Sequence, residues 1–423
     1  MYLTIMGILI ALIILALAFL GAPVFSLIGG GALYLFWAAG IDSSAVIVEM
    51  LRLASLPALI AIPLFTFAGY VLAESRSPGR MLRLGAALFG FLPGGLAIAA
   101  LCATAIFTAF TGASGVTIIA LGGLLYPMLT KQGYPEKFTL GLITTTGSLG
   151  LLFPPSLPII LYGLIAKISI DSLFKAGLLP GLFLLAVLSV YALTVAKRAG
   201  IQKQSFSWVE LKNAARENAW EIPLPFLIIG GIYRGFFTAS EAASIMAFYV
   251  LITEVLIHRE LSLLRDIPKI AVKSMMLVGA IFVVLGTALG FTNYLIDAQI
   301  PDQIFAWLHS FVASKVLFLV ILNAFLLVIN MVEIFSAIII VVPIIAPIAM
   351  NYGIDPIHLG IIFLLNLEIG YMTPPLGLNL FLSSSRFDKK LPELYSATLS
   401  FWFILLGVLA LVTYFPQLFF IKP

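Results

Sequence analysis

The sequence predicts an all-α, polytopic membrane protein that contains an inverted-topology repeat, two re-entrant hairpins and two broken helices. Three observations predict this class: an apolar composition, a repeat at an offset of 220 residues, and a Pro-Pro pair in each repeat. Of the 423 residues, 62% are hydrophobic and 10% are charged, against about 45–50% and about 25% in soluble domains. A spanning helix needs about 20 apolar residues, which leaves room for more than about ten spans. A soluble protein is excluded, and so is a β-barrel, because apolar and polar residues do not alternate.

Short gaps separate the apolar runs, which lie at 2–20, 23–40, 55–73, 84–110, 116–130, 138–166, 177–196, 222–235, 239–257, 274–296, 304–330, 337–350, 357–385 and 395–420. Most Lys and Arg residues lie in five gaps, at 74–83, 131–137, 197–216, 258–273 and 386–390. The positive-inside rule places these gaps in the cytoplasm and both termini outside. Because the net charge of +4 is spread over these gaps, we expect no nucleic-acid partner.

The uncharged segment 111–115 predicts the first re-entrant hairpin. It joins two apolar runs that lie between the basic gaps 74–83 and 131–137. If both gaps are cytoplasmic, the two runs enter and leave the membrane by the same face. The tip of such a hairpin must be buried in protein or line a wet cavity.

The repeat relates Gly150–Pro155 to Gly370–Pro375, Pro127 to Pro347 and Gly133 to Gly353. The basic gap 74–83 corresponds to 294–303, which has Asp297 and Asp302 and no Lys or Arg. Equivalent loops with opposite charge indicate halves of opposite orientation, the construction of many secondary transporters. The segment 197–221 is then the cytoplasmic crossover between the halves.

Each Pro-Pro pair predicts a broken helix. Proline removes a backbone donor and clashes with the carbonyl four residues earlier. Pro154-Pro155 would thus free the carbonyls of Gly150 and Leu151, and Pro374-Pro375 those of Gly370 and Tyr371. Bare carbonyls attract a cation, while the N-terminus of the half-helix that follows each break favours an anion. The alternative is a simple proline kink repaired by neighbouring residues.

Oxygen-bearing residues around the hairpin tips and breaks predict a sodium site, because such hard ligands suit a small cation. The predicted sodium ligands are Thr111, Gly112, Ser114, Gly147, Gly150, Leu151, Glu333, Ser336, Gly370 and Tyr371. The predicted substrate contacts are Thr111, Ser114, Pro155, Ser156, Glu333, Thr373, Pro375 and Asn379. The alternative for the small residues is close helix packing.

Two acids, Glu333 at the second hairpin tip and Glu368 in an apolar run, need a reason to be there, because an acid near the centre of a spanning helix costs about 2.5–3.5 kcal/mol on insertion. Glu333 is a candidate ion ligand or proton carrier, and Glu368 precedes the second break. The alternative is an acid at the edge of a water-filled cavity, or one that is hydrogen-bonded and protonated.

Gly112-Ala113-Ser114-Gly115 matches the Gly-x-Ser-Gly motif of rhomboid intramembrane proteases, which would make Ser114 a nucleophile. Such an enzyme also needs a histidine base on another helix. The three histidines, His258, His309 and His358, are expected away from a mid-membrane serine. We therefore expect a protein that is not an enzyme, with the protease as a remote alternative.

Five segments, 107–115, 147–163, 176–181, 230–243 and 373–379, resemble the large membrane subunit (M subunit) of TRAP (tripartite ATP-independent periplasmic) transporters. The resemblance covers nearly the whole chain. It implies an elevator-type, sodium-coupled importer of small organic acids, such as C4-dicarboxylates or sialic acid, in the bacterial inner membrane. It implies two partners, a small four-helix membrane subunit and a periplasmic substrate-binding protein. Sodium is the implied coupling ion, and no organic cofactor is expected.

The resemblance also implies a division of the chain. Scaffold helices are expected at 1–83 and 177–303, the transport-domain hairpins and broken helices at 84–176 and 304–385, and a C-terminal helix at 386–423. A stand-alone Na⁺- or H⁺-coupled organic anion transporter that needs no binding protein is the main alternative. A channel is a weaker one, because re-entrant tips with broken helices suit an occluded site better than a pore.

Overall fold

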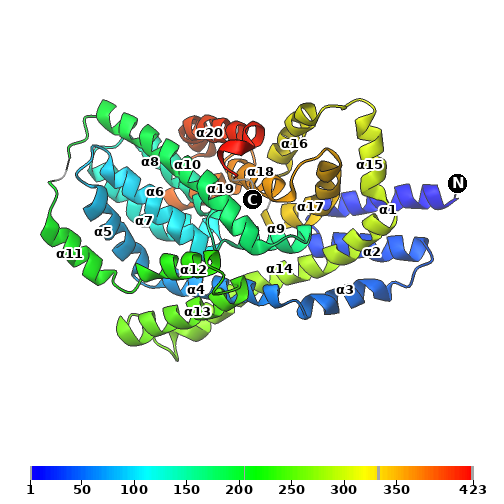
Figure 1. The fold of residues 1–423 in the computed structure, drawn as a ribbon, viewed down its shortest axis with the longest axis horizontal. Coiled ribbons are helices and arrows are strands. Elements are labelled where there is room, and N and C mark those ends of the chain that lie inside the picture. Colours follow the sequence, from blue (N-terminus) through cyan, green and yellow to red (C-terminus); the bar gives the residue numbers. More distant parts are fainter. Residues whose placement is uncertain (1, 204, 331–333, 421–423) are drawn as a thin grey trace.

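The computed structural model describes residues 2–203, 205–330 and 334–420, and these residues form helices joined by turns, with no strand among them (Figure 1). The first half contains α1 (Tyr2–Phe19), α2 (Val24–Ala38), α3 (Ser44–Ala54), η1 (Pro57–Ile60), α4 (Ala61–Glu74), α5 (Ser77–Phe89), α6 (Gly95–Thr111), α7 (Ser114–Lys131), α8 (Glu136–Thr146), η2 (Leu149–Leu152), α9 (Leu157–Ala166) and α10 (Ile170–Arg198). Helix α11 (Trp208–Glu217) lies in the crossover between the halves.

The second half contains α12 (Pro223–Tyr233), α13 (Ala239–Ile252), η3 (Thr253–Ile257), α14 (Asp266–Asp297), α15 (Ile300–His309), α16 (Lys315–Ile329), α17 (Ile334–Asn351), α18 (Pro356–Gly370), α19 (Leu378–Phe387), α20 (Leu391–Tyr414) and η4 (Pro416–Leu418). Helix α17 begins and ends 220 residues after α7. Helices α16, α18, α19 and α20 likewise begin within one residue of that offset from α6, α8, α9 and α10. The repeat predicted from scattered Gly and Pro residues is therefore present as a repeat of helices.

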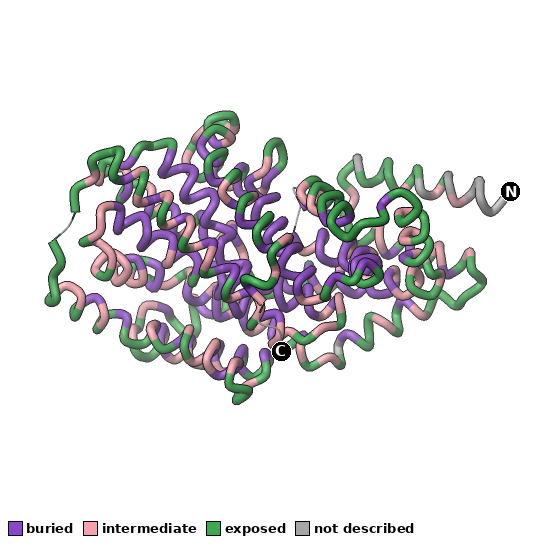
Figure 2. Tube along the Cα trace, turned by 45° about the horizontal axis from the view of Figure 1, so that its top comes forward, coloured by how far each residue is buried: buried purple, intermediate pink, exposed green. Residues whose placement is uncertain are grey.

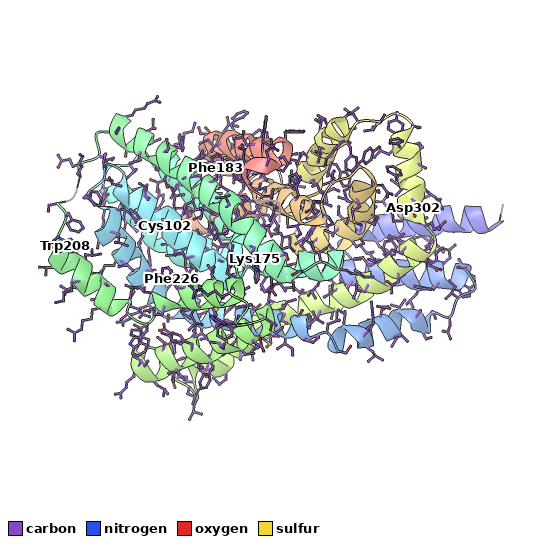
Figure 3. All side chains as sticks on the ribbon, viewed as in Figure 1. Cys102, Lys175, Phe183, Trp208, Phe226 and Asp302 are labelled. Atoms are coloured by element: carbon purple, nitrogen blue, oxygen red, sulfur yellow. The ribbon has the colours of Figure 1, made fainter. Side chains whose placement is uncertain are left out.

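The two repeats are inverted. Helix α7 ends at Lys131, and the next residues, Gln132 and Gly133, line a surface pocket with residues 199–203 of the crossover. Helix α17 ends at Asn351, whose side chain bonds Asp302 of α15. Figure 3 shows Asp302 and the crossover residue Trp208 at opposite ends of the molecule. The equivalent helices thus point in opposite directions.

Packing between the repeats is reciprocal. Helix α7 packs on α19 and α17 packs on α9, so each hairpin contacts the half-helix after the break in the other repeat. Helix α8 packs on α20 while α10 packs on α18, and α4 packs on α13 while α2 packs on α14. This exchange places the hairpin tips and the breaks at the interface between repeats, where inverted-repeat transporters bind substrate.

The basic segments lie on one side of the molecule, as the positive-inside rule requires. Arg83 of α5 forms ion pairs with Glu210 and Glu217 of α11. Arg80 pairs with Glu260, in the loop before α14. Lys389 pairs with Glu136, which joins the segments 386–390 and 131–137.

Seven helices of the described residues are long and apolar enough to cross a membrane, and an eighth crossing results if α8–η2 and α9 count as one bent span. This is fewer than the apolar runs suggested, because several runs fold as helices of 10–17 residues: α2, α6, α12, α16 and α18. Of these, α6 and α16 are arms of the hairpins and α18 is part of the second broken helix, and each is too short to cross alone. Apolar content therefore overstates the number of full spans.

Buried residues lie mainly in the middle of the molecule, and exposed residues surround them (Figure 2). In the first repeat every residue from Phe138 to Gly163 is buried, including those of the break. Large apolar side chains are exposed on the outside of the molecule, among them Trp208 and Phe226, both labelled in Figure 3. A membrane or a partner subunit is the medium that such a surface requires.

The expected division of the chain does not coincide with helix ends. The boundaries after residues 83, 176, 303 and 385 fall inside α5, α10, α15 and α19. The hairpin of each repeat is instead preceded by a short amphipathic helix, α5 or α15, and the broken helix is followed directly by a long span, α10 or α20.

Candidate functional site

The first hairpin tip is a tight turn of two residues between α6 and α7. Gly112 has a φ of 64°, in the left-handed region that favours glycine. A Cβ at Gly112 would lie 2.4 Å from Cγ of Leu157, the first residue of α9. Thr111 and Ser114, which flank the turn, are buried. The tip thus packs closely against the half-helix that follows the first break.

The first break is also in contact with α6. A Cβ at Gly150 would lie 2.4 Å from the backbone oxygen of Ala105 and 2.4 Å from the backbone nitrogen of Ala109. The hydroxyl of Thr108 donates to the carbonyl of Gly147 at 3.1 Å and lies 2.8 Å from the hydroxyl of Thr117. Helix α8–η2 meets α9 at an angle of 44°. The first tip and the first break therefore lie in one buried region, as predicted.

The second break repeats this arrangement with a different exposure. A Cβ at Gly370 would lie 2.5 Å from the carbonyl oxygen of Asn330, the residue after α16. Both peptide bonds that join the paired prolines are cis. Pro155 and Ser156 are buried, whereas Pro375 is exposed and Thr373 is partly buried. The two repeats are thus not equivalent in their access to the surroundings.

The expectation that the breaks leave four bare carbonyls is wrong. The carbonyl of Gly150 accepts from the backbone N–H of Phe153, and that of Gly370 from Thr373, both at 3.0 Å. The carbonyl of Leu151 accepts from the hydroxyl of Ser156 at 2.6 Å. The carbonyl of Tyr371 accepts from the backbone N–H of Asn379 at 3.0 Å. Turn and side-chain donors replace the lost helical bonds, and a carbonyl oxygen with two lone pairs can accept a cation beside such a donor.

Asn379 joins the second broken helix to the first. Its side-chain nitrogen donates to the carbonyl of Thr144 at 3.0 Å and to the hydroxyl of Ser148 at 3.3 Å. The hydroxyl of Thr144 donates to that of Ser383, on α19, at 2.9 Å. The side-chain oxygen of Asn379 is buried and has no partner among the described residues. The predicted substrate contact Asn379 thus lies between the repeats with a free acceptor.

Thr373 has a structural contact that the sequence did not indicate. Its hydroxyl donates to the carbonyl of Ile369 at 2.8 Å and accepts from the indole nitrogen of Trp402 at 2.9 Å. The carbonyl of Pro375 accepts from the hydroxyl of Tyr395 at 3.2 Å. Helix α20 therefore stabilises the second break through two side-chain hydrogen bonds.

The structure describes only part of the second hairpin tip. Glu333 lies outside the described residues, so its predicted role stays a prediction. Ser336 lies in the first turn of α17. Asn330, on the other side of the tip, is fully buried, and its side-chain oxygen and nitrogen have no hydrogen-bond partner among the described residues. Its polar atoms are available to a ligand at the second tip.

Glu368 is the most unusual group near the second break. It is fully buried in α18, and neither carboxyl oxygen has a partner in the described part of the chain. An unpaired buried carboxylate is costly, so such a group requires a cation or a proton. The repeat equivalent, Ser148, is a bonded hydroxyl.

Sequence reasoning missed part of this polar region. The hydroxyl of Thr146 is buried without a partner in the described chain, and its repeat equivalent, Asn366, donates to Asn323 of α16 at 2.7 Å. The signal was present as three consecutive threonines, 144–146, inside an apolar run.

The protease alternative finds no support. Among the described residues no hydrogen bond joins Ser114 to a histidine. The ring of His358 lies 2.9 Å from the carbonyl of Val412, and His309 stacks on Phe305. His258 lies beside Glu221, near the crossover.

Comparison with known proteins decides the family. A sequence model described as "Tripartite ATP-independent periplasmic transporter, DctM component" matches residues 8–418. The chain belongs to the DctM family of TRAP transporter large permeases. It is a subunit of a transporter, and the family resemblance seen in the sequence is confirmed.

Named DctM relatives cover most of the chain. The C4-dicarboxylate TRAP transporter large permease protein DctM of Pseudomonas aeruginosa is 37% identical over 360 residues, covering 85% of this chain and 84% of that protein. The ectoine/5-hydroxyectoine TRAP transporter large permease protein UehC of Ruegeria pomeroyi is 34% identical over 362 residues, covering 85% and 84%. Relatives of similar identity thus carry the names of different substrates.

The fold also resembles a solved transporter structure. The YdaH transporter of Alcanivorax borkumensis superposes with a TM-score of 0.65, covering 92% of this chain and 89% of that one, at 14% identity. At this identity the likeness concerns the fold alone.

Large permeases of the DctM family work with a periplasmic binding protein and usually with a small membrane subunit.

Proposed function

We propose that this TRAP large permease imports small organic acids together with sodium, by an elevator movement of the hairpins and broken helices against the remaining helices. The observation that carries the proposal is the close contact of each hairpin tip with a helix break, at Gly112 and Gly370. Buried polar atoms without partners in the described chain gather there, on Thr146, Asn330 and Asn379.

Sodium coupling is supported by the chemistry of these groups. They include the hydroxyl of Thr146 and the side-chain amide oxygens of Asn330 and Asn379, and such oxygens suit a hard cation better than a soft metal. Glu368 adds a buried carboxyl group that lacks a partner among the described residues. A cation near the second break would compensate an ionised Glu368.

An organic acid as the substrate is supported by the half-helices. Helices α9 and α19 begin at Leu157 and Leu378, directly after the breaks, and their N-terminal N–H groups and dipoles favour a carboxylate. We place the carboxylate between Ser156 and Asn379, near the first tip. The relatives named for C4-dicarboxylates and ectoine agree with a small carboxylate solute.

An elevator movement is supported by how the helices group. Helices α2, α3 and α4 pack on α13 and α14, while α6 to α9 pack among themselves and with α17 to α19. The first group would be the scaffold and the second the moving part. We expect a small four-helix membrane subunit to cover part of the exposed apolar surface of the scaffold, and both termini to lie in the periplasm.

The test is a double variant in which both prolines of the first break are replaced by alanine. Pro154→Ala plus Pro155→Ala lets α8 continue toward α9, so sodium-driven uptake in proteoliposomes should fall by about tenfold or more. Pro223→Ala is the matched control, because Pro223 is the first residue of α12, where proline is readily replaced. Uptake in the double variant equal to that of the control, with the same sodium dependence, would refute the proposed site.

A further inference from the structure

A buried cluster of charged side chains lies away from the hairpins, where the crossover meets the end of α13. Arg80 of α5 forms ion pairs with three carboxylates, those of Glu221, Glu254 and Glu260. Glu254 is fully buried and Glu221 is 6% exposed. His258 stands beside them, with its Nε2 3.5 Å from a carboxyl oxygen of Glu221.

The cluster contains more negative charge than Arg80 balances. Three carboxylates against one guanidinium leave a net charge of −2 when all three are ionised and His258 is neutral. Arg76 and Arg216 line the adjoining cavity but are exposed, and Arg83 is paired with two glutamates of α11. Buried charge without compensation is costly, and a divalent cation would neutralise it.

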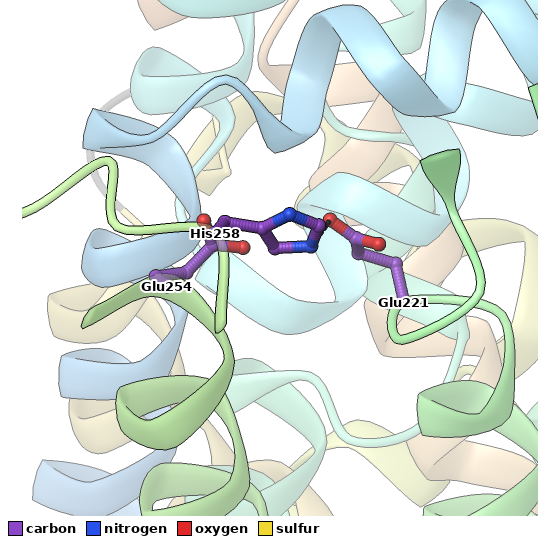
Figure 4. A group of neighbouring side chains, drawn as sticks. All are labelled: Glu221, Glu254 and His258. Atoms are coloured by element: carbon purple, nitrogen blue, oxygen red, sulfur yellow. Dashed lines mark ion pairs between the residues drawn. The ribbon is translucent and has the colours of Figure 1, made fainter. Parts of the chain in front are cut away.

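Two ligand atoms in this cluster have no hydrogen-bond partner among the described residues. They are the Oε2 of Glu221 and the Nε2 of His258. Figure 4 shows the imidazole of His258 directed at the carboxyl group of Glu221, with Glu254 on the other side of the ring. One ligand atom from each of Glu221, Glu254 and His258 lies within 4.8 Å of the other two.

The backbone supports this arrangement. Residues 253–257 form a π-helix, η3, and π-helices occur frequently at functional sites. His258 directly follows η3 and lies four residues after Glu254, so the two side chains lie on one face. Glu221 comes from the crossover, so a bound ion would tie two distant segments together.

We propose that Glu221, Glu254 and His258 form a binding site for a divalent transition-metal cation such as Zn²⁺. One imidazole and two carboxylates are typical zinc ligands, whereas calcium and magnesium prefer oxygen alone. The zinc–ligand distance of about 2.0–2.2 Å requires the three side chains to draw together on binding. Arg80 remains on the other oxygen of Glu221 and orients that ligand, as outer partners of metal sites do.

One of the three ligands faces a surface cavity. This cavity, of about 690 Å³, is lined by His258 and Glu260 and also by the arginines Arg76, Arg80, Arg83 and Arg216. An open cavity leaves a coordination position for water, so the ion should exchange with the medium. The site is independent of the sodium site, because none of its residues belongs to the hairpins or breaks.

The test is zinc titration of the purified chain in detergent or nanodiscs, followed by calorimetry and by the melting temperature. We expect one zinc ion per chain, with a dissociation constant of about 1 μM, and a higher melting temperature with zinc. His258→Ala removes a ligand and should weaken zinc binding by at least about 10- to 100-fold, the effect of losing an outer partner of a metal site. His309→Ala is the matched control and should bind as the wild type does, since His309 is exposed on α15.

A conservative variant separates ligation from folding. His258→Cys keeps a zinc ligand and should bind zinc more tightly than His258→Ala. The proposal is overturned if the wild-type chain binds no zinc at about 1 mM, or if His258→Ala and His309→Ala bind it equally. In either case His258 would serve only as a neighbour of Glu221 in the ion-pair cluster.

Discussion

The contact between Gly150 and α6 predicts how a single methyl group would change transport. In Gly150→Ala the new Cβ would lie 2.4 Å from the backbone of Ala105 and of Ala109. Neither neighbour is a flexible side chain, so α6 and the first break must separate. Overpacking of this kind costs about 1–3 kcal/mol.

This strain acts where the sodium ligands are proposed. If it falls on the sodium-bound state, about 1–3 kcal/mol corresponds to an affinity loss of about 5- to 150-fold. The assay is the sodium concentration that gives half-maximal uptake in proteoliposomes, together with the melting temperature. Gly279→Ala is the control, because a Cβ at Gly279 meets nothing within 4 Å.

The sodium dependence of Gly150→Ala decides the interpretation. We expect a shift to higher sodium concentration while the substrate is still transported at saturating sodium. A variant with wild-type sodium dependence and wild-type melting temperature would show that the contact between α6 and the break does not shape an ion site.

Three further predictions follow from particular contacts. Arg80→Ala leaves Glu221, Glu254 and Glu260 without their shared cation, so thermal or denaturant unfolding should show a loss of stability of about 3–5 kcal/mol. Arg216→Ala, at an exposed position, is the control and should change stability by less than about 0.5 kcal/mol. Equal losses of stability in the two variants would contradict the role of the cluster. Asn379→Leu removes the bonds to Thr144 and Ser148 and should lower stability by about 1–3 kcal/mol and slow uptake. Asn213→Leu, at an exposed position of α11, is its control. Unchanged uptake in Asn379→Leu would remove Asn379 from the site. Burial raises the pKa of Glu260, but the N–H of Arg76 and the guanidinium of Arg80 outweigh burial and leave its pKa below the ordinary value. A carboxyl group whose pKa is lower in the folded state stabilises the chain above about pH 4.3, the pKa of an unfolded glutamate. This stability is lost as the pH falls through the folded pKa. Melting temperatures measured at decreasing pH should therefore fall less in Glu260→Gln than in the wild type. An equal fall in both proteins would refute a stabilising role for ionised Glu260.

Much of the fold could be predicted because it depends on strong local signals. Two Pro-Pro pairs 220 residues apart cannot continue a helix, and both positions are helix breaks in the structure. The small uncharged segment at Gly112 forms a tight turn because glycine adopts a positive φ there. The opposite charge of equivalent loops indicated the inversion, because basic residues gather on one side.

Parts of the site depend on tertiary contacts that periodicity does not contain. The carbonyls of Leu151 and Tyr371 accept from donors of Ser156 and Asn379, which lie beyond the breaks. The interaction of Trp402 with Thr373 joins α20 to a break 29 residues earlier. The cluster around Arg80 combines α5, the crossover and η3, and nothing local in the sequence relates these segments.

The predicted boundaries between scaffold and moving part fall inside helices for a similar reason. Apolar runs do not show where an amphipathic helix such as α5 begins. Helix α5 starts at Ser77, because the preceding residues Ser75 and Arg76 are not helical and Pro78 lies in its first turn. Residue 83 therefore lies inside a helix.

The most direct test of the central claim is uptake in proteoliposomes that contain this chain with its small membrane subunit. Uptake of a radiolabelled organic acid is measured with an imposed inward sodium gradient, with and without the periplasmic binding protein. We predict that uptake requires both the gradient and the binding protein. Uptake that is indifferent to sodium would contradict the proposed ion coupling, and sodium-driven uptake without a binding protein would contradict the proposed dependence on a tripartite assembly.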